Sequence, residues 1–286
     1  MSFLALIIAL SMRQLWGAEP WLHRDSWWYG YRERVAALGV SGWIQLGLAV
    51  VLPALLLGIF LDVLAPVLFG LPWILLAAVV LLYSFGRGDF QARIAQYRGH
   101  CERGNYEAAW LYLCGELEAD DLAVASGSAS ADAADLRLQE RLLYDGYQRW
   151  FAVVFWFVLL GPAWAFGYRL LQMSVHGVSP SPCAAQLLHW VDWLPVRVLA
   201  ITFTLAGDFV RSHNALREAV VDTSSDAPSV LRAVGASAAY AWEGAADSAA
   251  EAAIGVAGEM IPALSSLLTR SGVVWVVAIA LVAIID

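Results

Sequence analysis

The sequence predicts an all-α membrane protein: a polytopic helical bundle with about four transmembrane helices, or five, and a cytoplasmic helical segment. Hydrophobic residues make up 60% of its 286 residues and charged residues only 15%, whereas soluble domains carry roughly 25% charged residues. The stretches from Arg34 to Asp62 and from Asp62 to Arg87 contain no charge between their ends, and each exceeds the ~20 residues that cross a hydrocarbon core. Trp43 precedes the first of the two spans that these stretches predict, and Trp73 lies near the start of the second, at the depth that amphipathic rings favour.

Four transmembrane helices are predicted in order along the chain. Their ranges are residues 44–61, 67–85, 150–172 and 264–285. The first two form a hairpin whose short turn contains Asp62 and Pro66. A helix in the core of a soluble protein would show a polar face, which these stretches lack.

The distribution of arginine indicates how the chain is oriented. All 17 basic residues are arginine; four precede the first span, none lies in the hairpin turn, and seven lie in residues 86–149. By the positive-inside rule the N-terminus and residues 86–149 are cytoplasmic, and the hairpin turn faces the other side. Within 86–149, Phe90, Ile94 and Tyr97 recur at helical spacing, which predicts a helical segment.

Residues 187–207 leave the topology open. They are apolar enough for a fifth span, yet they contain Asp192 and Arg197, which could pair across a kink at Pro195. We favour an amphipathic or re-entrant element over a fifth span. Four spans place the C-terminus inside the cell, and five place it outside.

The composition argues against several classes of function. Without lysine, neither a Walker-type nucleotide site nor a lysine Schiff base can form. The net charge of −8 argues against nucleic acid as a partner. Three scattered cysteines and five scattered histidines show no metal-ligand spacing, so no metal site is predicted. No catalytic motif and no cofactor motif is present, and no catalytic residue is predicted.

Two polar clusters near the first two spans are candidate binding sites. His23, Arg24 and Asp25 stand beside aromatic residues and could bind a sugar or an anion, although an interfacial anchor with local ion pairs is the more common outcome. Arg87 and Asp89 follow the second span in a glycine-rich stretch whose backbone N–H groups could hold a phosphate. A simple turn with Asp89 capping the next helix explains that stretch equally well.

Asp192, Trp193 and Arg197 form the sharpest candidate for a binding site. Charged side chains in an otherwise apolar segment are costly and often mark function in membrane proteins. A structural ion pair that fixes the bend at Pro195 is an equal alternative.

Three stretches carry a resemblance to a known family. FAVVFWFVLLGPAWAFGYRLLQ, HWVDWLPVRVLAITFTLAGDF and WLHRDSWWYGY look like AmpE, a bacterial inner-membrane protein linked to induction of the chromosomal AmpC β-lactamase. The resemblance extends over nearly the whole chain. It implies an accessory role in sensing cell-wall breakdown, or in transmitting that state to β-lactamase induction. Besides the lipid bilayer, the partners it suggests are a muropeptide or another membrane protein.

A second resemblance supplies the alternative function. AmpE is similar to the cobalamin-biosynthesis membrane enzyme that makes cobinamide phosphate, which implies a membrane enzyme acting on an amphiphilic cell-wall or cofactor precursor. The polar motifs of that enzyme are missing here, and LLYDGYQRW stands upstream of FWFVLLGP instead. The missing motifs favour a non-catalytic regulator. A transporter ranks third, because four spans make a small pathway.

Overall fold

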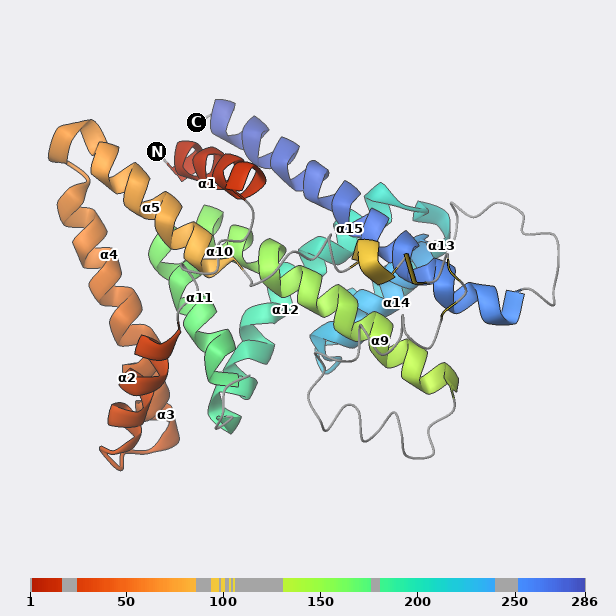
Figure 1. Ribbon diagram of the computed structural model, residues 1–286, viewed down its shortest axis with the longest axis horizontal. Helices are drawn as coiled ribbons and strands as arrows, with labels where there is room; N and C mark the ends of the chain where they lie inside the picture. Colours follow the sequence, from red (N-terminus) through yellow and green to blue (C-terminus); the bar gives the residue numbers. More distant parts are fainter. Residues whose placement is uncertain are drawn as a thin grey trace. The chain divides into compact units, whose positions relative to one another are not determined.

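The computed structural model describes most of the chain (Figure 1). The described residues are 2–16, 25–85, 94–97, 99–100, 103, 105, 131–175, 181–239 and 252–285. Every regular element in them is a helix, which confirms the all-α fold class. The chain divides into two compact units. Unit 1 comprises Met1–Gly88, Gln148–Pro195 and Ala278–Asp286, and unit 2 comprises Asp89–Tyr147 and Val196–Val277.

Unit 1 is built around helix α11. Its elements are α1 (Ser2–Trp16), α2 (Ser26–Ala36), α3 (Gly42–Leu46), the π turn η1 (Gly47–Val51), α4 (Leu52–Leu64), the 3-10 turn η2 (Val67–Gly70), α5 (Leu71–Ser84), α10 (Ala152–Leu160), α11 (Pro162–Val175) and the first part of α12 (Pro182–Ala206). Helix α11 packs against α4, α5 and α10, and α1 packs against α5. The hairpin of α4 and α5 therefore meets α11, which is distant from it in the sequence, and α10, which directly precedes α11, packs on the same helix.

The hairpin of α4 and α5 has apolar side chains on its outer surface. Helices α3, η1 and α4 run continuously, and Pro53 follows the π turn. Because proline has no backbone N–H, the carbonyl four residues earlier loses its regular partner, which favours a wider turn. The connection to α5 reverses through Leu68 and Phe69, both with positive φ, and Phe69 is 96% exposed. Within the helices Leu55, Ile59 and Leu75 are more than half exposed, which suits a hydrocarbon environment.

Three helical stretches among the described residues are long and apolar enough to cross a membrane. They are Gly42–Leu64, Val67–Ser84 and Met260–Ile285, the last belonging to α15 (Ala252–Ile285). They overlap the predicted spans 44–61, 67–85 and 264–285. Residues 187–207 fall almost entirely within α12, which is not among the three. The amphipathic or re-entrant element favoured for residues 187–207 stays a prediction.

The region predicted as one span over 150–172 is divided in the structure. Helix α10 ends at Leu160, and α11 begins at Pro162. Between them Gly161 has φ +91° and ψ −179°, a conformation that is open essentially to glycine alone. Pro162 then begins the next helix without an N–H group to satisfy. The two helices pack against each other beyond this corner.

Unit 2 is a second helical cluster. It contains α9 (Ala131–Gly146), the last part of α12, α13 (Phe209–Val221), α14 (Ala227–Ala239) and most of α15; the π turn η3 (Tyr147–Phe151) begins at its boundary. Helix α14 packs against α9 and α13. Gly207 lets the chain approach α14, since a Cβ there would stand 2.5 Å from the carbonyl oxygen of Ala238. Arg232 of α14 joins Glu140 of α9 at 2.9 Å. Much of the predicted segment 86–149 lies outside the described residues.

Candidate functional site

Asp25 is a buried carboxylate at the start of α2. Its backbone carbonyl accepts hydrogen bonds from the N–H groups of Trp28 and Tyr29, at 2.9 and 3.2 Å, which begin the helix. Its side chain is only 5% exposed and contacts residues of α5 and α11. Oδ1 accepts a hydrogen bond of 3.1 Å from the hydroxyl of Tyr83 on α5, and Oδ2 lies 4.0 Å from Nη2 of Arg169 on α11. A buried charge is tolerated when it is paired and hydrogen-bonded, as here.

The polar cluster continues from Arg169 along α11. Nη1 of Arg169 donates a hydrogen bond of 3.3 Å to the side chain of Gln172. The amide of Gln172 in turn donates a hydrogen bond of 3.1 Å to the backbone carbonyl of Gln148, which lies in the π turn η3. A π turn interrupts the regular helical hydrogen-bond pattern. The side-chain amide of Gln172 therefore gives a carbonyl of this turn a hydrogen-bond donor.

Asp192 on α12 is the second buried carboxylate of unit 1. It has no exposed surface, and it accepts a hydrogen bond of 2.7 Å from the hydroxyl of Tyr168. Tyr168 immediately precedes Arg169 on α11. Successive residues project about 100° apart around a helix. Tyr168 and Arg169 therefore leave α11 in different directions, the first toward Asp192 and the second toward Asp25. We call Asp25, Tyr83, Tyr168, Arg169 and Asp192 the α11 network.

Arg197 belongs to unit 2, where it contacts the end of α13. Its guanidinium donates a hydrogen bond to the backbone carbonyl of Asp222, the residue that ends α13. The carboxylate of Asp222 accepts hydrogen bonds from the hydroxyls of Ser224 and Ser225 and from the N–H of Ser224. These bonds stabilise the charged form and lower the pKa of Asp222 to about 2.

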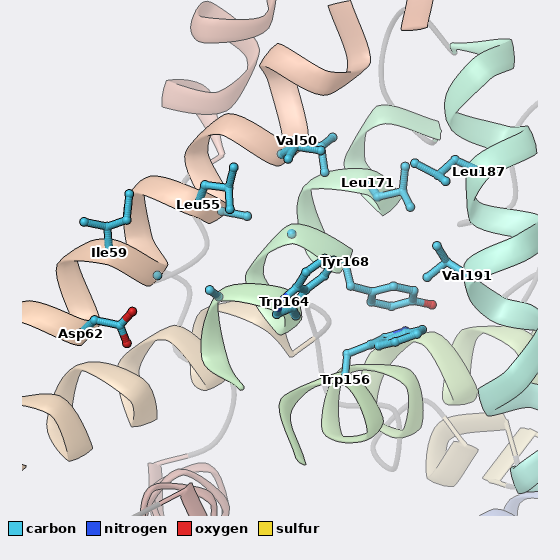
Figure 2. Close-up of a pocket in the computed structure, with 15 residues that line it drawn as sticks. Val50, Leu55, Ile59, Asp62, Trp156, Trp164, Tyr168, Leu171, Leu187 and Val191 are labelled. Atoms are coloured by element: carbon cyan, nitrogen blue, oxygen red, sulfur yellow. The ribbon is translucent and has the colours of Figure 1, made fainter. Parts of the chain in front are cut away.

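An apolar cavity of about 450 Å³ lies beside the α11 network. Its lining residues are Val50, Val51, Ala54, Leu55, Gly58, Ile59, Asp62, Trp156, Ala163, Trp164, Gly167, Tyr168, Leu171, Leu187 and Val191. Most come from facing stripes of α4 and α11, so we call it the α4–α11 groove. Figure 2 shows Asp62 at one end and Leu187 and Val191 toward the other. The volume lies in the range of small-molecule sites.

Small residues bring the two walls of the groove together. A Cβ on Gly58 would stand 3.4 Å from Cβ of Ala163, and one on Gly167 would stand 3.2 Å from Cβ of Ala54. These pairs show that α4 and α11 run antiparallel where they touch. Among the described residues no group of three His, Cys, Asp or Glu side chains could hold a metal ion.

Comparison with known proteins decides the family. The family described as regulatory signalling modulator protein AmpE matches residues 1–286, the whole chain. The chain belongs to the AmpE family. The resemblance seen in the sequence is confirmed, and AmpE proteins are regulatory signalling modulators by description. No curated protein and no solved structure matches the chain.

The structure brings together only part of the set of residues that the sequence suggested for this AmpE chain. Outside the described residues lie His23, Arg24, Arg87 and Asp89. Asp25 and Asp192 both join the α11 network, whereas Trp193 is half-buried on α12. Arg197 contacts the end of α13 in unit 2. The proposed pairing of Asp192 with Arg197 stays a prediction, and the hydrogen bonds described here lead to Tyr168 and to Asp222.

Sequence reasoning missed the residues that connect the two carboxylates in this AmpE chain. Tyr83, Tyr168 and Arg169 were not proposed as site residues. Arg169 carried a usable signal, because it is a charge inside a predicted span, and such charges mark functional sites in membrane proteins. The tyrosines carried none, since interfacial and core tyrosines have the same sequence context.

Proposed function

We propose that this AmpE chain is a multi-pass protein of the bacterial inner membrane that modulates signalling in cell-wall-linked β-lactamase induction. The family description supports a regulatory signalling role, and the three apolar helices support a place in the membrane. The arginine distribution favours a cytoplasmic N-terminus.

The observation that carries the proposal is the position of α11 between two buried carboxylates. A shift or rotation of α11 moves Tyr168 and Arg169 together, and therefore changes the contacts of Asp192 and Asp25 at once. Packed helices with alternative arrangements are the elements through which proteins transmit a state between sites. A muropeptide or a partner membrane protein that binds one arrangement better would shift the population toward it.

The experiment measures β-lactamase activity after exposure to an inducing β-lactam, in a host with an inducible chromosomal β-lactamase and this gene as its only copy. We expect Tyr168→Phe and Arg169→Gln to change inducibility at equal membrane abundance. Arg34→Gln, which alters an exposed arginine, is the matched control. If deletion of the whole gene leaves induction unchanged, the proposal is wrong.

The alternative is a membrane enzyme acting on an amphiphilic precursor. An enzyme of this kind needs an acid and a base that face its substrate. The groove has one carboxylate, Asp62, on its wall, while Asp25 and Asp192 are absent from its lining. We therefore rank the enzyme second. Turnover of an added amphiphile by the purified protein would reverse the order.

A further inference from the structure

The α4–α11 groove is long enough for an extended hydrocarbon chain to lie along α4. Val50 and Asp62 stand at the two ends of its stripe on η1 and α4, twelve residues apart, which corresponds to about 18 Å of helix. The lining follows that length of the helix, and Leu187 and Val191 extend it on α12. An extended chain that lies along α4 can therefore contact the wall throughout.

The chemistry of the lining excludes a polar occupant along most of this length. Apart from Asp62, the polar side chains on the wall are those of Tyr168 and two tryptophans. The hydroxyl of Tyr168 already donates its hydrogen to Asp192, behind the wall. Polar atoms of a ligand would lose their hydrogen bonds to water here without replacement, which is costly. A hydrocarbon chain carries no such cost.

The groove opens toward the surroundings of a membrane-spanning helix. Its wall on α4 belongs to Gly42–Leu64, one of the three stretches able to cross a membrane. On its rim Leu55, Ile59 and Trp164 are more than half exposed. The medium that these side chains meet in a bilayer is lipid hydrocarbon, so the occupant can enter sideways from the bilayer.

Asp62 is the charged side chain at one end of the groove. It lies two residues before the end of α4, so it stands near the end of the span where head groups begin. It is exposed, and none of the described hydrogen bonds or ion pairs involves it. It is also the single charge between Arg34 and Arg87. A carboxylate there attracts an ammonium group and repels a head group with only negative charge.

From these four observations we infer that the α4–α11 groove binds one chain of an amine-bearing phospholipid and that Asp62 holds its ammonium group. The inference does not depend on the proposed role in β-lactamase induction. Lipid retention by the purified protein tests the groove, and inducibility in cells tests the function, so either can fail alone.

The experiment is native mass spectrometry of the full-length protein, purified in mild detergent and incubated with equal amounts of phosphatidylethanolamine and phosphatidylglycerol. We expect the wild type to retain phosphatidylethanolamine preferentially, by about two- to fivefold, as for a solvent-exposed ion pair. The substitution Asp62→Asn should abolish the preference while leaving the groove intact. Phosphatidylethanolamine with an acetylated amine should lose the preference on the wild-type protein as well.

A matched pair of variants tests whether the groove itself holds the chain. Leu55 and Leu56 are neighbours on α4 and are 56% and 58% exposed, yet only Leu55 lines the groove. Leu55→Trp should lower retention of both lipids about tenfold, because the indole displaces two or more methylene groups. Leu56→Trp should leave retention unchanged.

Four results would overturn the inference. Equal retention of the two lipids by the wild type, or an unchanged preference in Asp62→Asn, would mean that Asp62 selects no ammonium group. Equal effects of Leu55→Trp and Leu56→Trp would place the lipid on the general surface of the span. A lipid-free dimer that Leu55→Trp dissociates would identify a second copy of the chain as the occupant. The test with acetylated lipid uses wild-type protein. It therefore shows whether the preference depends on the ammonium group even if a variant fails to fold.

Discussion

The hydroxyl of Tyr168 donates a 2.7 Å hydrogen bond to Asp192, a carboxylate that has no exposed surface. The bond joins α11 to α12, and Tyr168 also lines the α4–α11 groove. One side chain therefore has two roles: its ring lines an apolar space, and its hydroxyl helps to satisfy a buried charge. Removing the hydroxyl while keeping the ring separates these roles.

Tyr168→Phe is expected to destabilise the protein without changing the shape of the groove. A buried acceptor that loses a donor costs about 1–3 kcal/mol. The melting temperature in mild detergent measures the loss, and Tyr29→Phe, at an exposed tyrosine on α2, is the control. An unchanged melting temperature would show that the bond contributes nothing to stability.

Asp25 and Arg169 are expected to depend on each other. Removing one partner of a buried ion pair leaves an uncompensated charge and costs about 3–5 kcal/mol. The 4.0 Å separation and the partial exposure of Arg169 place this pair at the lower end of that range or below it. Asp25→Asn and Arg169→Gln should each lower the melting temperature.

The double variant Asp25→Asn/Arg169→Gln should be less destabilised than the sum of the two single variants. The difference is the coupling energy of the pair. Additive effects would show that Asp25 is held by Tyr83 and by its other surroundings rather than by Arg169.

Gly161→Ala should destabilise the corner between α10 and α11. The φ of +91° with extended ψ costs of order 1–3 kcal/mol for a residue with a side chain. Gly30→Ala is the matched control: Gly30 lies inside α2, and an added Cβ meets nothing within 4 Å. Alanine there should be neutral or stabilising by about 0.5–1 kcal/mol. If both variants melt alike, the corner is not under backbone constraint.

The turn between α13 and α14 is expected to weaken in acid. In the folded protein the pKa of Asp222 is lowered to about 2, below its unfolded value of 3.8. The stabilisation is therefore complete above about pH 4 and is lost as the pH falls toward 2. Ser225→Ala removes one donor and raises the folded pKa, so it should melt lower than wild type at pH 6. The melting temperatures of the two proteins should converge near pH 2. A difference that stays constant from pH 6 to pH 2 would show that hydrogen bonds to the charged Asp222 are not its cause.

The turn between α4 and α5 is expected to lie on the outer side of the membrane. A cysteine placed at Leu68, which is exposed in the turn between α4 and α5, should react with a membrane-impermeant maleimide in intact spheroplasts. The positive-inside rule places this turn outside. A cysteine at exposed Arg34 should react only after lysis, and the reverse pattern would invert the proposed orientation.

The hairpin of α4 and α5 could be predicted from sequence because its signal is local. Long uncharged runs need a membrane wherever they occur, and the charges at Arg34, Asp62 and Arg87 delimit them. The corner at Gly161 could not. A Gly-Pro pair is tolerated inside membrane helices when neighbours satisfy the backbone, so the apolar pattern reads equally as one helix or as two.

Some residues of the candidate site could be singled out from local sequence, whereas contacts between distant segments could not. Asp192 was proposed as a charge in an apolar segment and Asp25 as part of a polar–aromatic cluster, and both are buried with hydrogen-bonding partners. Their partners Tyr83 and Tyr168 stand 58 and 24 residues away in the sequence. The groove depends on how α4 and α11 meet, which no single stretch of sequence contains.

The pairing of Asp25 with Arg169 also sets an order of events during synthesis. Arg169 follows Asp25 by 144 residues, which takes about 7–30 s at 5–20 residues per second. Throughout that interval Arg169 is not yet available to pair with the carboxylate of Asp25. The contact between the start of α2 and α11 can therefore form only after α11 has been made, long after the contact of α2 with η1 can form.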